Sequence, residues 1–187
     1  MVKLDVITTR GGDTGETSLG DNARVRKDAP RIEAIGAVDE ANAAIGLLRL
    51  HTEGEEDAAL ARVQNGLFDL GADLCVPGEG GGRLRMTAGH VAALDAATAA
   101  MNAGLPPLGS FVLPGGTPGA AAAHLARTVV RRAERAVVRL SAEEAVNPEA
   151  LRYLNRLSDL LFVMCRAINA AGDHPDVLWQ QGRSRGR

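Results

Sequence analysis

The amino-acid sequence predicts an all-α fold, a five-helix bundle formed by one domain over residues 1–187, with a glycine-rich segment at its N-terminus. Two observations predict it. Five segments carry apolar residues at helical spacing, and stretches rich in Pro and Gly separate them. Aromatic residues make up only 3% of the chain and alanine is abundant, which suits closely packed helices with small side chains at their contacts. A chain of 187 residues is also long enough to bury one full core.

The charge and hydropathy of the chain argue against several classes of protein. A formal net charge of −2 gives no general attraction to nucleic acid or to a membrane surface. No apolar run approaches the ~20 residues of a membrane span, and the N-terminus lacks the apolar core of a signal peptide, so we expect a cytoplasmic protein. Cys75 and Cys165 lie in apolar helical patterns and are interpreted as buried small hydrophobes, not as a disulfide or a metal pair.

The helix expected over residues 118–140 has the clearest start signal in the chain. Thr117 is suited to the N-cap, and a proline follows at the first helical position. A polar stripe of Arg127, Arg131 and Glu134, at spacing i, i+4, i+7, runs along the edge of its apolar face. Guanidiniums beside a core need acceptors, and their planar shape suits carboxylates and phosphates. The stripe therefore marks either a ligand site or two arginines that acids of the fold neutralise.

Four further helices are expected, and polar residues interrupt the apolar faces of two of them. In the first helix, Asp39 and Glu40 lie either on a solvated face or opposite Arg127 or Arg131 as their acceptors. In the last helix, Asn155 begins a narrow polar stripe through a mostly apolar face. The four helices are expected over residues 31–50, 58–74, 88–102 and 148–171.

Three segments lack a helical period. Residues 1–30 combine glycines, hydroxyls and cations, which suits a loop whose backbone N–H groups surround an anion, with a flexible arm as the alternative. The segment lacks the Gly-Lys-Ser/Thr ending of a Walker P-loop. Phe111 lies between prolines and glycines, either as an apolar wall of a ligand pocket or as a plug that packs the loop down. Residues 173–187 are expected to form a loose tail.

Six motifs, taken in order, resemble those of the PduO-type ATP:cob(I)alamin adenosyltransferases, and the resemblance extends from Thr8 to about Asn169. They are Thr9-Arg10-x-Gly12-Asp13-x-Gly15-x-Thr17, Lys27-Asp28, Val38-Asp39-Glu40-x-Asn42, Phe111-Val112-Leu113-Pro114-Gly115-Gly116, Arg131-Arg132-Ala133-Glu134-Arg135 and Tyr153-Leu154-Asn155-Arg156-Leu157-Ser158-Asp159. One departure is Thr14, where many members of the family carry Lys or Asp, and the missing cation would weaken contacts with phosphate.

The resemblance implies an enzyme that transfers the 5′-deoxyadenosyl group of ATP to cob(I)alamin and releases triphosphate. It also implies a homotrimer with active sites between neighbouring subunits, Mg²⁺ bridging the phosphates of ATP, and a cobalamin reductase and an adenosylcobalamin-dependent enzyme as partners. Segment 1–30 would be the ATP loop.

The resemblance also assigns site residues, although it leaves open which of them hold the metal. Asp39 and Arg127 would pair across the subunit boundary, and Phe111 would press on the corrinoid and displace its lower ligand. With Arg131 and Glu134, these three residues make up the implied catalytic set. The residues implied to contact ATP or its metal are Thr9, Arg10, Gly12, Asp13, Gly15, Thr17, Ser18, Lys27, Arg131, Glu134 and Asn155.

Two other classes of protein compete with this interpretation. A di-iron carboxylate bundle would need Glu-x-x-His motifs on its helices, and the sequence contains none. A catalytically inactive, ATP-sensing trimeric relative would keep the nucleotide site without the chemistry. Phe111 and the Asp39/Arg127 pair favour the enzyme over this alternative.

Overall fold

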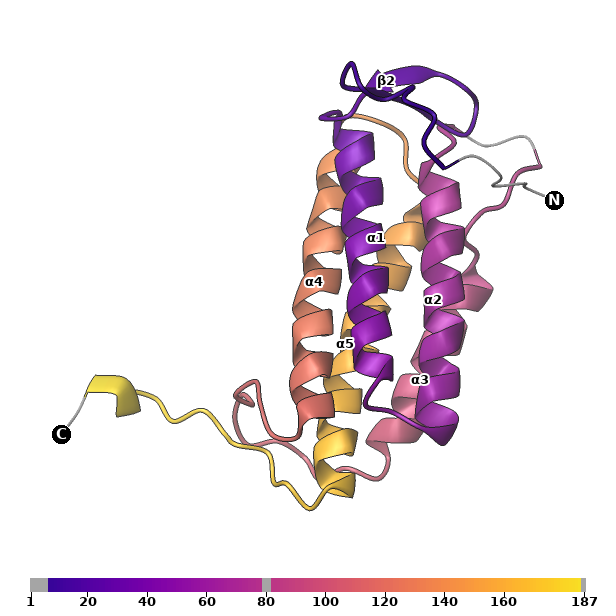
Figure 1. The fold of residues 1–187 in the computed structure, drawn as a ribbon. Helices are drawn as coiled ribbons and strands as arrows, with labels where there is room; N and C mark the ends of the chain where they lie inside the picture. Colours follow the sequence, from indigo (N-terminus) through magenta and orange to yellow (C-terminus); the bar gives the residue numbers. More distant parts are fainter. Residues whose placement is uncertain (1–6, 79–81, 186–187) are drawn as a thin grey trace.

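The computed structural model describes residues 7–78 and 82–185, and within them it forms the five helices that the sequence predicts (Figure 1). These are α1 (Pro30–Arg49), α2 (Gly54–Leu74), α3 (Ala88–Asn102), α4 (Pro118–Ser141) and α5 (Pro148–Ala171). Helix α4 packs along α1 and α5, α1 packs along α2, and α3 lies against α5. The predicted all-α bundle is therefore confirmed.

The ends of the helices follow local chemistry. Thr117 caps α4 by accepting a hydrogen bond from the backbone N–H of Ala120 at 3.2 Å, as its place before a proline predicts. Helix α2 begins at Gly54, earlier than the expected start near residue 58. Its first turn holds Glu55, Glu56 and Asp57, and carboxylates are favourable there because of the helix dipole. An acidic stretch that reads as a polar turn is thus the start of a helix.

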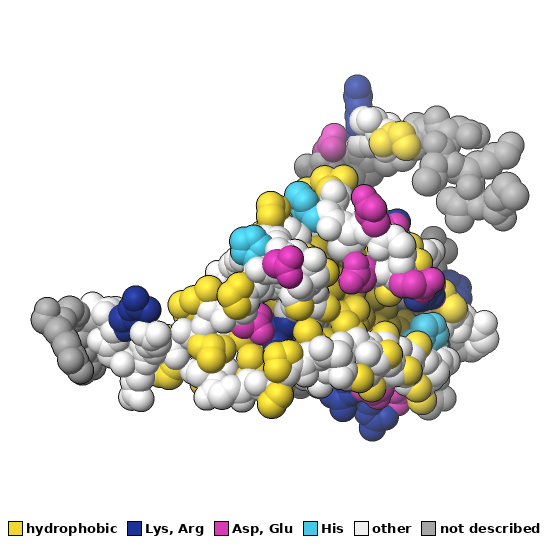
Figure 2. Space-filling model, turned by 90° about the horizontal axis from the view of Figure 1, so that it is seen from below, with side chains coloured by type: hydrophobic (Ala, Val, Ile, Leu, Met, Phe, Trp, Pro, Cys, Tyr) yellow, Lys and Arg dark blue, Asp and Glu magenta, His cyan; other side chains and the backbone are white. Residues whose placement is uncertain are grey.

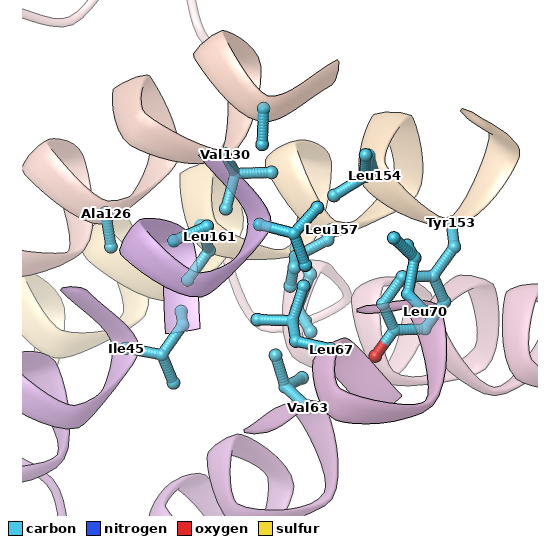
Figure 3. Close-up of a cluster of buried hydrophobic side chains, with 14 of the residues drawn as sticks. Ile45, Val63, Leu67, Leu70, Ala126, Val130, Tyr153, Leu154, Leu157 and Leu161 are labelled. Carbon is cyan, nitrogen blue, oxygen red and sulfur yellow. The ribbon is translucent and has the colours of Figure 1, made fainter. Parts of the chain in front are cut away.

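Hydrophobic side chains from α1, α2, α4 and α5 fill the centre of the bundle (Figure 3). Ile45, Leu67, Val130, Leu157 and Leu161 are all at most 1% exposed. Burying a side chain of this size contributes about 1.5–3 kcal/mol each, so this interior holds the helices in register. In the part of the chain that the structure describes, no helix carries an apolar stretch long enough to cross a bilayer.

Two irregular segments lie at opposite ends of the bundle (Figure 1). The N-terminal one contains an antiparallel hairpin of β1 (Glu16–Ser18) and β2 (Arg24–Arg26), which precedes α1 directly. The sequence predicts only that this segment is not helical, because strands of three residues are too short to show a period. The C-terminal segment, expected as a loose tail, extends away from the other end of the bundle and closes with a short 3₁₀ turn, Arg183–Arg185.

Candidate functional site

The N-terminal segment brings eight candidate residues together. Its fold depends on glycine: Gly15 has a φ of 84°, and its carbonyl accepts a hydrogen bond from the backbone N–H of Lys27 at 2.9 Å. A Cβ at position 12 would lie 2.8 Å from Lys27 Nζ, so the ammonium group folds closely over Gly12. All eight residues are exposed or half-buried: Thr9, Arg10, Gly12, Asp13, Gly15, Thr17, Ser18 and Lys27. The segment therefore presents them to solvent, where a ligand can reach them.

The cations of this segment fall into two groups. Arg26 donates two hydrogen bonds to the carboxylate of Asp28, at 2.8 and 2.6 Å, and these bonds hold the pKa of that carboxyl below its usual range. Arg24 approaches Glu16 at 3.6 Å. Arg10 and Lys27, by contrast, form no ion pair with any residue that the structure describes. These two cations remain available for an anionic ligand.

A second group of candidates lies on the facing sides of α4 and α5. Asn155 Nδ2 donates to Glu134 Oε1 at 3.1 Å, so the structure brings these two predicted residues into contact. The amide oxygen of Asn155 in turn accepts from Arg156 Nη1 at 2.6 Å, which fixes the orientation of the amide. Arg131, one turn before Glu134 on the same stripe, is exposed and forms no ion pair within the described ranges.

Arg127 and Asp39 lie on different faces of the chain. The guanidinium of Arg127 lies over the ring of Phe162 on α5, 6.0 Å from its centroid, and its Nε is buried without a hydrogen-bond partner in the described structure. Asp39 is exposed and lines a cavity of about 480 Å³ between α1 and α2, beside Phe68. The neighbouring Glu40, considered as an acceptor for the same arginines, pairs instead with Arg132. Asp39 and Arg127 therefore do not pair with each other within one chain.

The segment between α3 and α4, which contains Phe111, lies at the end of the bundle far from the hairpin (Figure 1). Hydrophobic side chains are visible over this end of the molecule (Figure 2). The side chain of Phe111 is 79% exposed, which argues against the interpretation of this residue as a plug that packs the loop down. The ring of Trp179 contacts it edge-on, with the centroids 6.3 Å apart, and Trp179 N donates to the carbonyl of Phe111 at 2.7 Å. Leu113 N donates to the carbonyl of Val177 at 2.8 Å, so the tail is tied to this loop. Tail and Leu113 together line a cavity of about 710 Å³.

Two features of this end are not predicted from the sequence. The first is the pairing of residues 177–179 with 111–113, for which the only signal is a tryptophan in a polar tail. The second is His124, which is buried and continues the stripe of Arg127 one turn earlier. Its Nδ1 lies 3.7 Å from the sulfur of Cys165, and burial and the nearby Arg127 lower its pKa. Burial raises the pKa of the Cys165 thiol to about 12, so this cysteine is unreactive.

In a protein metal site, several acidic, histidine or cysteine side chains lie together. Within the described residues, no group of three or more of them is arranged to hold a metal ion.

Comparisons with known proteins agree on one family. The family profile described as cobalamin adenosyltransferase matches residues 7–168. A cobalamin adenosyltransferase of Cupriavidus metallidurans is 53% identical over 97% of both chains. The corrinoid adenosyltransferase of Mycobacterium tuberculosis is 47% identical over 98% of this chain and 97% of its own.

A solved structure resembles the fold along nearly its whole length. It is a variant of the PduO-type ATP:corrinoid adenosyltransferase from Lactobacillus reuteri complexed with cobalamin and ATP, with a TM-score of 0.87 and 34% sequence identity. The match covers 93% of this chain and 99% of that one. With the profile matching most of the sequence and relatives of nearly the same extent, this chain belongs to the cobalamin adenosyltransferase family.

Proposed function

We propose that this chain transfers the 5′-deoxyadenosyl group of ATP to cob(I)alamin, giving adenosylcobalamin and triphosphate. One observation carries the proposal: the ammonium group of Lys27 lies close to Gly12 in the N-terminal segment, and Lys27, Arg10 and Arg131 have no ion-pair partner among the described residues. Arg10 and Lys27 lie in the same exposed, glycine-rich segment, and cations without an acidic partner suit a polyanionic ligand such as the triphosphate of ATP. The relatives named corrinoid adenosyltransferases, and the Lactobacillus reuteri enzyme complexed with ATP and cobalamin, support the same activity.

The proposed site forms between two copies of the chain. Asp39 and Arg127 lie on different faces, and Arg127 keeps a buried Nε without a partner. A buried donor without an acceptor is costly, so an acceptor supplied by a second copy would stabilise the assembly. We therefore propose a homotrimer in which Asp39 of one subunit meets Arg127 of the next. The hairpin of one subunit then faces Arg131, Glu134 and Asn155 of its neighbour.

The phosphates of ATP are assigned to the cationic hairpin and to Arg131. Negative charge grows on the leaving triphosphate as the C5′–O bond breaks, and cations already in place stabilise it without reorganisation. The donor set fits Mg²⁺, because Glu134 uses only one carboxylate oxygen in its hydrogen bond with Asn155 and Mg²⁺ prefers carboxylate and phosphate oxygens. Bound with ATP, the ion would neutralise part of the phosphate charge; Glu134 and Asp13 are the residues that would hold it.

The corrinoid is assigned to the end of the chain that carries Phe111. The cobalt of cob(I)alamin supplies the nucleophile, so the reaction needs no Ser/His or Cys/His pair from the protein. A Co–C bond forms at C5′ as triphosphate leaves with the electrons of the broken C–O bond. An exposed ring such as that of Phe111 can cover the lower face of the corrin and exclude water and other ligands. We expect the protein in the cytoplasm, with a cobalamin reductase upstream and an adenosylcobalamin-dependent enzyme downstream.

Loss of the Co(I) absorbance in the presence of Mg-ATP tests the proposal. The wild-type protein should consume cob(I)alamin and yield adenosylcobalamin in equal amounts. An Arg132→Ala variant is the matched control for Arg131→Ala, because Arg132 pairs with Glu40 of its own chain. Loss of turnover in Arg131→Ala with activity kept in Arg132→Ala supports the site. ATP binding by the wild type without turnover would instead identify an inactive ATP sensor.

A further inference from the structure

The N-terminal hairpin packs against the C-terminal end of α2. The last carbonyls of a helix have no partner within it and must be satisfied from outside. Here Arg31 Nη1 donates to the carbonyl of Leu74 at 2.6 Å, and the backbone N–H of Gly20 donates to the carbonyl of Cys75 at 2.9 Å. The hairpin thus completes the end of α2, and the position of that end sets the position of the hairpin.

Gly20 is the contact through which the hairpin is held. Its carbonyl accepts from Arg83 Nη1 at 2.9 Å, and its N–H donates to Cys75. Within the described ranges, these are the only hydrogen bonds between residues 8–28 and the body beyond α1. A Cβ at Gly20 would lie 2.9 Å from Val76 Cγ2, so the hairpin fits closely against the end of α2.

A buried carboxylate organises this end of the helix. Asp73 is 3% exposed. Its Oδ1 accepts from Arg85 Nη1 at 2.6 Å, and its Oδ2 accepts from Met86 N and from Asn147 Nδ2, both at 2.7 Å. A buried charge is tolerated when it is paired and fully hydrogen-bonded, as this one is. Asp73 therefore fixes Arg85 in one orientation and ties it to the start of α5.

Arg85 also donates hydrogen bonds to the backbone against which the hairpin packs. Its Nη1 also donates to the carbonyl of Asp73 at 2.6 Å, and its Nη2 donates to the carbonyls of Val76 and Gly78 at 2.9 and 2.7 Å. The guanidinium thus spans the last turn of α2 and the chain that leaves it. Those residues flank Cys75, the acceptor for Gly20.

We propose that Asp73 and Arg85 are positioning residues for the nucleotide: they fix the end of α2, and through Gly20 they hold the ATP hairpin in its binding conformation. Neither residue touches ATP in this scheme. The inference rests on the proposed function, because it takes the hairpin as the nucleotide loop. Loosening the contact between the hairpin and the end of α2 should weaken ATP binding and leave the chemical step intact, since a change in binding alone raises KM at constant kcat.

Three substitutions at two positions, Arg85 and Arg83, test the inference. Arg85→Met keeps the length of the side chain and removes the guanidinium. We expect this variant to raise the KM for ATP about tenfold. Its kcat at saturating ATP should stay within about twofold of wild type, and its KM for cob(I)alamin should be unchanged. Arg85→Lys, which keeps the charge, should recover part of the loss. Arg83→Ala removes an exposed side chain that donates to Gly20, so it should fold normally and raise the KM for ATP about threefold.

Arg49→Met is the matched control. Arg49 at the end of α1 pairs with Asp57 in the first turn of α2 through two hydrogen bonds of 2.7 and 2.8 Å. This pair resembles the Arg85 pair in chemistry, and it lies at the end of the two helices that is far from the hairpin. This variant should lower thermal stability without changing the KM for ATP. Hydrogen exchange on the ligand-free proteins gives a second measurement: residues 8–28 should exchange faster in Arg85→Met than in Arg49→Met.

The outcomes separate the inference from the proposed function. Wild-type protein that leaves Co(I) unconsumed would overturn the proposed function. An active wild type, with a wild-type KM for ATP in both Arg85→Met and Arg83→Ala, would overturn the positioning role alone. Unchanged hairpin exchange in Arg85→Met would overturn it as well. A raised KM for ATP with faster hairpin exchange, both absent in Arg49→Met, supports it.

Discussion

Removing Asp39 should break the assembly of the protein while leaving each subunit folded. Asp39 is exposed in the single chain, so Asp39→Ala removes no contact of the bundle itself. In the proposed trimer the same substitution leaves the guanidinium of Arg127 without an acceptor at each interface. A hydrogen bond to a charged group contributes about 1.5–3 kcal/mol, and a closed trimer contains three such interfaces. The expected loss is therefore about 5–9 kcal/mol per trimer, from three losses of that size.

Sedimentation velocity over a dilution series measures this loss. Since each 1.4 kcal/mol is a factor of ten, the trimer dissociation constant should rise by about 10³–10⁶. Glu40→Ala is the control: Glu40 is the neighbouring acid, but it pairs with Arg132 of its own chain, and an exposed pair of this kind contributes less than about 1 kcal/mol. The Asp39→Ala/Arg127→Ala double variant should lose less than the sum of the single variants, because the uncompensated charge is gone. Dissociation unchanged by Asp39→Ala, or strictly additive losses, would refute the pairing.

Three further predictions concern chemistry and pH. Arg131→Ala and Glu134→Ala should each lower kcat by about 10²–10³ without lowering Tm, and near-normal turnover in either would show that the site is misplaced. Phe111→Ala should keep ATP binding and lose most adenosylation from Co(II) plus reductant, with a smaller loss from pre-formed Co(I); equal losses would contradict its contact with the corrinoid. Because burial lowers the pKa of His124, protonation favours the unfolded chain, so stability should fall as the pH drops below about 6.5 towards the lowered value. His124→Gln should flatten this dependence in thermal melts, whereas the exposed His51→Gln should leave it intact.

The helical core could be predicted because its signals are local and periodic. Thr117 before a proline determines the start of α4 in the sequence as it does in the structure. The start of α2 is missed because Glu55, Glu56 and Asp57 are typical of polar turns and equally favourable in the first turn of a helix. The hairpin is missed because two three-residue strands, with Asn22 at a φ of 69° between them, leave no alternation to detect.

The candidate site could be predicted residue by residue but not in space. The contact between Glu134 and Asn155 joins two helices, and spacing along either helix gives no information about the distance between them. The same limit applies to Asp39 and Arg127, since a sequence does not say whether two charges meet within one chain or across two. The contact that holds the hairpin at Gly20 depends on carbonyl groups at the end of α2, and backbone groups have no sequence signature.

The contact between Phe111 and Trp179 gives the protein an optical probe of its own. The chain contains one tryptophan, so its intrinsic emission comes from a single indole, and that indole touches the ring assigned to the corrinoid. Corrinoids absorb at the wavelengths where tryptophan emits, so arrival of the substrate should quench this emission by energy transfer. A fluorescence titration of unlabelled protein would then follow corrinoid binding directly.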